Sequence, residues 1–232
     1  MKYLVHCILR RPAPCAAARG QGVIFVESGN LSAAVTPRGS GTAPPDARQL
    51  LGYERVISKL HASGPVIPLR YGCLVEDEAA AVRLLEEGSA GYEALLERLE
   101  NRVEMGLRVL WEAAGDSLPA PTPATPGAAY LAAARRRRCL EAELTPAERA
   151  WAAGVCAGLS DLYSEESQEA RFAGAGRLVS LYFLVPRQAV RRFRARLRRM
   201  VSGQGRGFLV SGPWPPYNFV NGAASHEGIH AG

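Results

Sequence analysis

The sequence has no apolar run long enough to cross a bilayer, which takes about 18 residues, and this argues against a membrane-spanning protein. The first residues, MKYLVHCILRR, lack a small-residue cleavage site, so we interpret them as a first β-strand and not as a signal peptide. The five cysteines never stand in a CxxC spacing. Scattered cysteines of odd number favour reduced thiols in a cytoplasm over a disulfide framework or a zinc site.

The sequence also lacks the spacing of an active site. It has no GxSxG motif, and nothing in the spacing of its serines, histidines and cysteines pairs a nucleophile with a base. The string HEGIH, His226–His230, has the HExxH form of zinc peptidases, but it contains a glycine and ends two residues before the chain does. We predict a disordered tail over residues 221–232, and no catalytic residue, metal or cofactor.

What the sequence does have is positive charge in its second half. The net charge is +6 at pH 7. Residues 1–118 carry 13 Lys/Arg against 14 Asp/Glu, whereas residues 119–232 carry 15 arginines against 8 acids. This asymmetry indicates two structural units of different character.

The first half alternates strand and helix patterns. An apolar run at residues 2–10 and a hairpin turning at Gly29-Asn30 come first, and a helix over 46–63 follows, with Asp46 as its N-cap. Acids and helix formers fill residues 76–100, with breaks at Gly88 and Gly91. Residues 102–111 alternate apolar and polar side chains, which is typical of a strand. We assign this last strand to the first unit, a ferredoxin-like α+β sandwich.

The string LPAPTPATPG has four prolines in ten residues and predicts a stiff connector. The second half then shows helices at AAYLAAARRRRCLEAEL and from Thr145, a strand RLVSLYFLV, a helix from Pro186, and a strand GFLV. The predicted fold is therefore α+β, with two modified ferredoxin-like domains, the second carrying extra helices. Their bounds are 1–118 and 128–220, joined by a proline-rich linker at 119–127.

Two arginine runs leave an alternative function open. Seven arginines lie between Arg187 and Arg199, and RRRR stands at 135–138. Nucleic acid binding would explain them. On a helix, however, Val190, Phe193, Leu197 and Met200 form one narrow apolar stripe, which favours a helix that packs on a sheet with a solvated basic face. The adjacent Tyr182 and Phe183 would point to opposite faces of their strand, so they do not form the paired stacking surface of RNA-binding sheets.

One motif whose residue choices need a reason is VIPLRYG. A proline inside a short strand removes a ladder donor, so Pro68 predicts an edge or bulged strand. Arg70 stands among apolar neighbours, and a buried guanidinium needs a partner, so we weigh an internal structural tie against a functional contact. The residues of this motif that we single out are Pro68, Leu69, Arg70, Tyr71 and Gly72.

The second motif, SGPWPPYNF, is rigid. Its three prolines fix φ and remove donors, and the aromatic side chains between them keep little entropy to lose on binding. Such a segment predicts a clasp across a domain junction or a docking ridge for a partner. Its candidate residues are Gly212, Pro213, Trp214, Pro215, Pro216, Tyr217 and Phe219.

At these two motifs the chain resembles the gas vesicle protein F/L family. LHASGPVIPLRYGCLVEDEAAAVRLL and GFLVSGPWPPYNFV are similar to its two signature regions, and the order of YLVHCIL, LENRVEMGLRVLW, AAYLAAARRRR and LVSLYFLVPR also agrees. Residues 68–70, Gly72 and 212–217 match the family pattern. The sequence departs mildly from the family at Tyr71, Cys73 and Asn218.

The resemblance implies a two-domain α+β protein that acts as a non-enzymatic accessory in building gas vesicles. It implies partners, namely the small hydrophobic shell protein A and other accessory proteins, and a location in the cytoplasm or on the vesicle. It does not choose between the F and L roles. We expect the Pro68 edge or the Trp214 ridge to contact the shell protein, since rigid aromatics and sheet edges suit an apolar partner.

Overall fold

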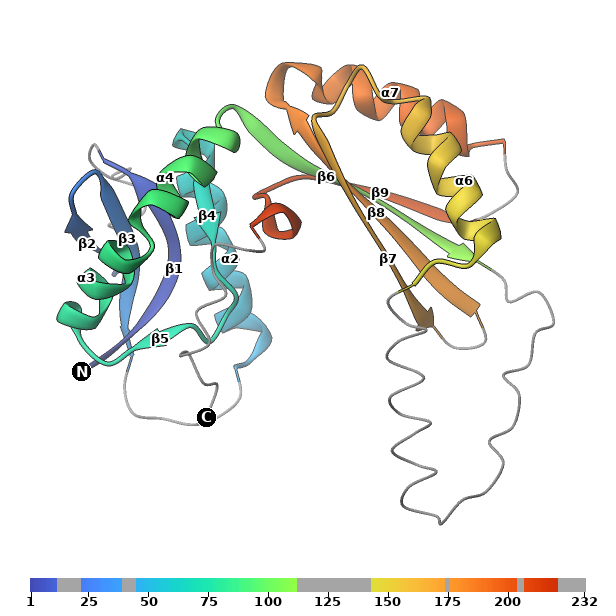
Figure 1. The fold of residues 1–232 in the computed structure, drawn as a ribbon. Coiled ribbons are helices and arrows are strands. Elements are labelled where there is room, and N and C mark those ends of the chain that lie inside the picture. The colour runs from blue at the N-terminus through green and yellow to red at the C-terminus, as the bar shows by residue number, and fades with distance from the viewer. Residues whose placement is uncertain (12–21, 39–44, 112–142, 174–175, 204–206, 221–232) are drawn as a thin grey trace, which may run out of the picture. The chain divides into compact units, whose positions relative to one another are not determined.

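The computed structural model describes residues 1–11, 22–38, 45–111, 143–173, 176–203 and 207–220, and these form two compact units (Figure 1). Of the described residues, those within Met1–Glu104 and residues 213–220 form the first unit, and those within Met105–Gly212 form the second. The predicted linker at 119–127, the arginine run at 135–138 and the predicted tail at 221–232 lie outside the described residues.

The first unit is built on an antiparallel sheet. Its strands are β1 (Lys2–Arg10), β2 (Ile24–Ser28), β3 (Leu31–Arg38), β4 (Val66–Pro68) and β5 (Leu74–Val75). The order is β2-β3-β1-β4, and β5 also pairs with β1. The predicted hairpin is confirmed, because β2 pairs with β3 and Gly29 takes the positive φ of +54° that the tight turn requires.

Three helices cover this sheet on both of its faces (Figure 1). They are α2 (Ala47–Ser63), α3 (Glu78–Glu87) and α4 (Ser89–Arg98). Asp46 caps α2 in a capping box, as predicted, and the expected break lies at Gly88, whereas Gly91 continues α4. β1 and β3 each bury five consecutive residues, which happens only where both faces of a strand are covered.

The strand β6 (Arg102–Trp111) corrects the predicted division of the chain. Its alternating pattern does form a strand, but the strand pairs in the second sheet, between β8 and β9, and not in the first. The compact units accordingly divide at Glu104 and not at residue 118. Local pattern specifies a strand, whereas the choice of sheet depends on partners far along the chain.

The second unit has an antiparallel sheet of order β7-β8-β6-β9. Its other elements are α6 (Pro146–Ala157), β7 (Glu165–Ala173), β8 (Gly176–Pro186), the short 3-10 helix η1 (Arg187–Ala189), α7 (Val190–Val201) and β9 (Phe208–Trp214). The helices α6 and α7 lie over one face of this sheet (Figure 1), where Phe183 of β8 packs on Phe193 of α7 with ring centroids 5.2 Å apart. The two-domain α+β class is thus confirmed.

Two details differ from the sequence prediction. The strand β7, EESQEARFA, has no counterpart in the sequence prediction, because its residues are mostly polar and show no period-2 alternation. β7 is an edge strand in which only Ala170 is buried, so it needs few apolar residues. The helix expected from Pro186 begins as η1 and becomes α-helical at Val190. Among the described helices, none combines the length and the apolar character needed to cross a membrane.

Candidate functional site

The two sequence motifs come together on helix α2 in the first unit. Tyr71, from the first motif, packs edge-on against Tyr53 of α2, with ring centroids 5.1 Å apart. Tyr217, from the second motif, donates its hydroxyl hydrogen to Glu54 Oε2 at 2.5 Å. Both tyrosines pack against the core cluster that α2 forms with β1 and β3. Segments about 145 positions apart in the sequence therefore meet at two consecutive helix residues.

Tyr53 joins three elements at the centre of this site. Its hydroxyl lies 2.9 Å from the carbonyl oxygen of Leu69 and 3.0 Å from that of Val5. A β-bulge between Val5 and Cys7 leaves His6 as the extra residue of β1, and the His6 ring stacks on the Tyr53 ring at 4.6 Å. Burial raises the pKa of Tyr53, so the hydroxyl keeps its hydrogen and remains a donor.

His6 is a buried imidazole at this bulge. Its Nε2 lies 3.1 Å from Thr36 Oγ1, and its Nδ1 is buried without a hydrogen-bond partner among the described residues. Burial lowers the pKa of His6 to about 4, because the cation cannot be solvated there. The ring is therefore neutral at pH 7.

We expect the first unit to lose stability as the pH falls from about 6.5 to about 4. The pKa of folded His6 is lowered, so the unfolded chain takes up a proton in this window and the folded chain does not; the loss is on the order of 3 kcal/mol. Urea unfolding of the wild type and of His6→Gln at both ends of the window measures it. An equal loss in both proteins would show that other groups carry the pH dependence.

The first motif supplies both structural and exposed residues. Pro68 is buried in β4, the last strand of the sheet order, as an edge position requires. The Leu69 N–H then donates to the His6 carbonyl at 2.9 Å, and Gly72 takes a φ of +97°, a conformation that favours glycine. Arg70 is exposed, and within the described residues its guanidinium makes no hydrogen bond or ion pair. The structure does not support the internal tie weighed for Arg70.

The second motif has an exposed half and an anchored half. Gly212 takes a φ of +102°, after which Pro213 and Trp214 are exposed, Trp214 by 45%. The rest is anchored in the first unit: Pro215 and Pro216 are buried, and a 3-10 helix, η2 (Tyr217–Phe219), ends with Phe219 only 6% exposed. The anchored half acts as a clasp within one unit and holds Trp214 out to solvent.

The carboxylate of Glu104 holds this clasp through two hydrogen bonds. Its Oε2 accepts the backbone N–H of Asn218 at 2.8 Å, and its Oε1 accepts the side-chain amide at 2.7 Å. Glu104 is buried, although the alternation of its strand had placed it on the polar face. Sequence reasoning missed Tyr53, Glu54 and Glu104 as members of the site. An acid on the polar face of a strand gives no signal of a partner more than a hundred residues away.

The thiols near the site are not activated. Burial raises the pKa of Cys73 to about 11, and it raises the pKa of Cys7 further. Both are therefore neutral thiols at neutral pH and poor nucleophiles. In the part of the chain that the structure describes, no group of three or more His, Cys, Asp or Glu side chains could hold a metal ion. The motif at His226–His230 lies outside those residues.

Strand β8 offers no surface on which bases could stack, as the alternative of nucleic acid binding would require. Tyr182 and Phe183 point to opposite faces, as predicted, and both are buried. Phe183 packs between Tyr163 and Phe193, and the Tyr182 hydroxyl donates to Glu169 Oε1 at 2.6 Å. The apolar stripe of α7 is buried at Phe193 and Leu197, as the helical spacing predicts.

Comparisons with known proteins identify the family of this chain. The model of the family described as "Gas vesicle synthesis protein GvpL/GvpF" matches residues 2–221. Two proteins of Streptomyces sp. (strain CB03234) are each 29% identical to this chain. Gas vesicle protein F aligns over 86% of the chain and 88% of its own length, and gas vesicle protein L over 77% and 70%.

Solved structures show the same fold. The crystal structure of GvpF from Anabaena sp. PCC7120 superposes with a TM-score of 0.69 at 15% identity, and it covers 94% of this chain and 98% of its own. GvpF from Microcystis aeruginosa gives the same TM-score and coverage at 12% identity. Because the F and L relatives match at equal identity, the likeness establishes a family and not one of its two branches.

Proposed function

Because the chain belongs to the gas vesicle synthesis protein GvpL/GvpF family, we propose that it is a non-enzymatic accessory of gas vesicle assembly that binds the hydrophobic shell protein A. Such an accessory would act in the cytoplasm, together with other accessory proteins, and at the growing vesicle. The observation that supports shell-protein binding is the exposed Trp214, held in place by an anchored segment.

The physical argument is preorganisation. Ordering a flexible aromatic side chain and its backbone on binding costs entropy, and a rigid segment has already lost that entropy on folding. Pro213, Pro215 and Pro216 fix the backbone on both sides of Trp214, and Tyr217 and Asn218 are hydrogen-bonded to Glu54 and Glu104. Trp214 can therefore cover apolar surface of a partner at small entropic cost.

The first unit has further exposed apolar side chains that could contact a partner. Leu50 and Leu51 of α2 lie within one helical turn of Tyr53 and Glu54, the residues that hold the two motif tyrosines, and both are exposed. Arg70 is the exposed polar member of the first motif. Tryptophan and arginine are enriched among the residues that dominate the binding energy of protein-protein contacts, so Trp214 and Arg70 are the first side chains to test.

We expect Trp214→Ala and Arg70→Ala to reduce affinity for shell protein A by about tenfold or more, with the free energy of unfolding unchanged to within about 0.5 kcal/mol. Both side chains are exposed, so their loss leaves the core intact. A binding titration with purified shell protein, alongside urea unfolding, measures both quantities. Ile24→Ala serves as the matched control, since Ile24 is an equally exposed apolar residue of β2, a strand that carries neither motif.

Full binding by both variants would remove these residues from the contact surface. Absence of binding by the wild type would instead contradict the proposed partner. Deletion of the gene in a vesicle-forming host, followed by inspection of cells for refractile vesicles, tests the accessory role itself. Vesicles of normal number and shape in the deletion strain would contradict that role.

A further inference from the structure

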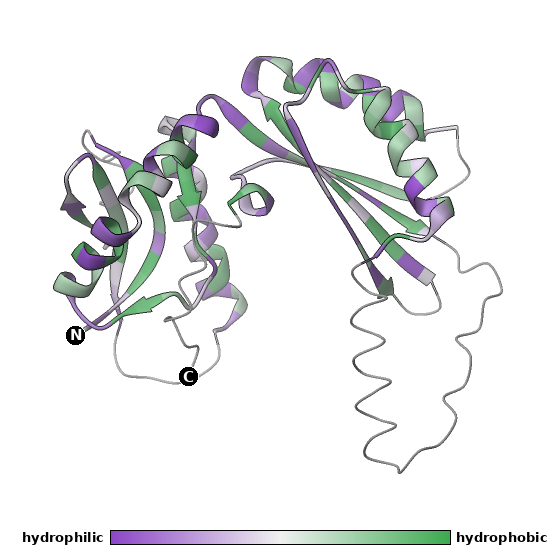
Figure 2. Ribbon diagram, in the orientation of Figure 1, coloured by the Kyte–Doolittle hydropathy of each residue, from purple (hydrophilic) through white to green (hydrophobic). Residues whose placement is uncertain are grey.

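Helix α7 carries a concentrated positive surface that the proposed function does not use. We call the exposed side chains of Arg191, Arg192, Arg198 and Arg199 the α7 arginine surface. Figure 2 shows the hydrophilic bands along this helix. Asp161 lies 3.9 Å from Arg192 and also pairs with Arg196. Within the described residues, Arg191, Arg198 and Arg199 have no carboxylate partner.

This charge pattern is unfavourable for the isolated helix. α7 contains six arginines and no acid, so Arg194 and Arg198 stand as like charges one turn apart, and Arg192 and Arg196 share the single carboxylate of Asp161. Arg191 also lies in the first turn, where the helix macrodipole is positive and disfavours a cation. A helix face that only contacts solvent would be more stable with both acidic and basic side chains. An external anion would relieve both costs.

A surface of the opposite sign lies in the first unit of the same chain. Glu86 and Glu87 are exposed in the last turn of α3, and that turn contains no basic residue. The C-terminal end of a helix is its negative end, so it disfavours anions. Glu97 stands in the last turn of α4, next to Arg98 in the sequence. Among the described residues, none of these three carboxylates is in an ion pair; Glu86 accepts only the Ser28 hydroxyl, at 3.3 Å.

We propose that the α7 arginine surface of one copy docks on the α3 carboxylates, Glu86 and Glu87, of a second copy. The two surfaces are complementary in charge and in the direction of their helix dipoles. Their charges are opposite, and the positive end of α7 would meet the negative end of α3, so each helix receives the counter-charge that its own dipole lacks. Arginine suits this role because its planar fork bonds a carboxylate through two parallel N–H groups.

A carboxylate partner is favoured over a nucleic acid. Sequence-tolerant binding of single strands needs aromatic rings, beside the cations, on which bases stack, and the one ring of α7, Phe193, is buried, as are Tyr182 and Phe183 of β8. The carboxylates, in contrast, are present on every copy of the chain. The proposal concerns contacts between copies and does not depend on shell-protein binding.

The test is the molar mass of the purified full chain against concentration, measured by sedimentation at about 50 mM and about 500 mM salt. We expect the mass to rise with concentration at low salt and to return to that of the monomer at high salt. Arg191→Glu/Arg192→Glu and, separately, Glu86→Arg/Glu87→Arg should each weaken association by about tenfold or more, since like charges then face each other. An equimolar mixture of the two variants should associate again, because it restores opposite charges across the contact.

The control is Arg48→Glu/Arg55→Glu, two exposed arginines of α2, which gives the same charge change on another helix and should leave association intact. Thermal unfolding guards against misfolding, and Arg191→Glu/Arg192→Glu should stay close to the wild type in stability, because acids in a first turn offset the loss of the exposed contact between Arg192 and Asp161. A wild type that stays monomeric at low salt overturns the proposal, and so does association that survives either reversal. Oligonucleotide binding by a monomer, lost in Arg191→Glu/Arg192→Glu, would assign the surface to nucleic acid instead.

Discussion

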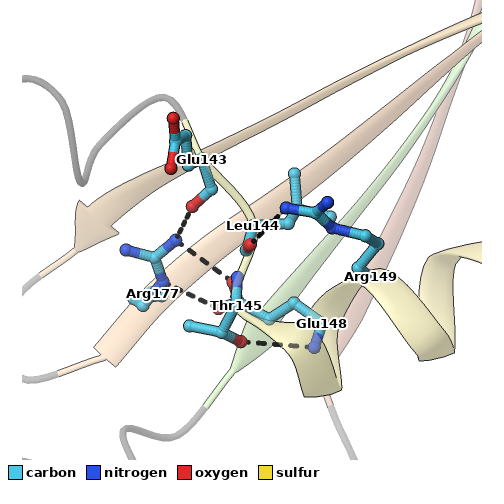
Figure 3. Close-up of polar contacts among 6 residues, drawn as sticks. All are labelled: Glu143, Leu144, Thr145, Glu148, Arg149 and Arg177. Atoms are coloured by element: carbon cyan, nitrogen blue, oxygen red, sulfur yellow. Dashed lines mark hydrogen bonds and ion pairs between the residues drawn. The ribbon is translucent and has the colours of Figure 1, made fainter.

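Replacement of Arg177 by methionine is expected to lower the free energy of unfolding of the second unit by about 3–5 kcal/mol. Arg177 on β8 lies beside Glu148 on α6 (Figure 3), with Nε 2.7 Å from Oε1 and Nη2 3.1 Å from Oε2. The side chain of Glu148 is fully buried, and that of Arg177 is 9% exposed. Methionine fills much of the arginine volume but leaves the buried carboxylate without its counter-charge.

The pKa of Glu148 reflects this environment. Burial alone would raise it, but hydrogen bonds from Arg177 and from the Thr145 N–H outweigh burial and hold the pKa below its ordinary value. The same carboxylate completes the capping box of α6, accepting the Thr145 N–H at 2.8 Å. Arg177 also donates to the Glu143 carbonyl at 2.6 Å. One guanidinium thus links the start of α6 to the sheet.

Urea unfolding measures the loss, followed by the fluorescence of Trp111 and Trp151, which pack edge-on in this unit at 5.7 Å. Arg149→Met is the matched control, because Arg149 is an exposed neighbour whose guanidinium, among the described residues, donates only to the Leu144 carbonyl (Figure 3); its change should stay within about 0.5 kcal/mol. Arg177→Met/Glu148→Met should regain much of the lost stability, since two apolar side chains replace the buried pair. A loss below about 1 kcal/mol in Arg177→Met would contradict the role assigned to this pair.

Phe219→Ala is the second change with a large expected effect, a loss of about 3–5 kcal/mol from the stability of the first unit. Phe219 is only 6% exposed, and truncation of a buried aromatic ring removes apolar burial and leaves a cavity. Its carbonyl also accepts a hydrogen bond from Arg98 of α4, so the segment that ends in Phe219 is tied to two helices.

Trp214→Ala provides the comparison within the same motif. Each change deletes one aromatic ring, and the two residues are five positions apart in the sequence, yet only Phe219 is buried. Thermal unfolding monitored by circular dichroism should therefore show a fall of several degrees for Phe219→Ala and almost no change for Trp214→Ala. Equal destabilisation by the two would mean that Trp214 belongs to the clasp and not to an exposed docking surface.

Much of the local structure was readable from the sequence. The turn at Gly29-Asn30, the cap at Asp46 and the capping box from Thr145 to Glu148 are short-range devices, and the structure contains each of them. The edge position of Pro68 follows from its missing donor in the same way. Such features depend on the chemistry of a few neighbouring residues, which is why a sequence can specify them.

The failures were of a different kind. β7 escaped because an edge strand with one buried residue leaves little periodicity to detect. Glu104 was expected on a polar face, but Asn218 docks on it and buries it. Arg70 was weighed as buried because its sequence neighbours are apolar, yet it follows the end of β4 and faces solvent. In each case the environment is set by residues remote in the chain.

The order of residues by itself indicated most of the helices and strands, the rigidity of the GPWPPY segment, and the membership of a gas vesicle protein family. Tertiary structure decided which sheet takes β6, and it brought Tyr71 and Tyr217 onto one helix. It also decided which ring of a single motif is core and which is surface. The physical reason is that torsion preferences and hydrogen-bond donors are properties of single residues, whereas burial and pairing exist only once distant segments meet.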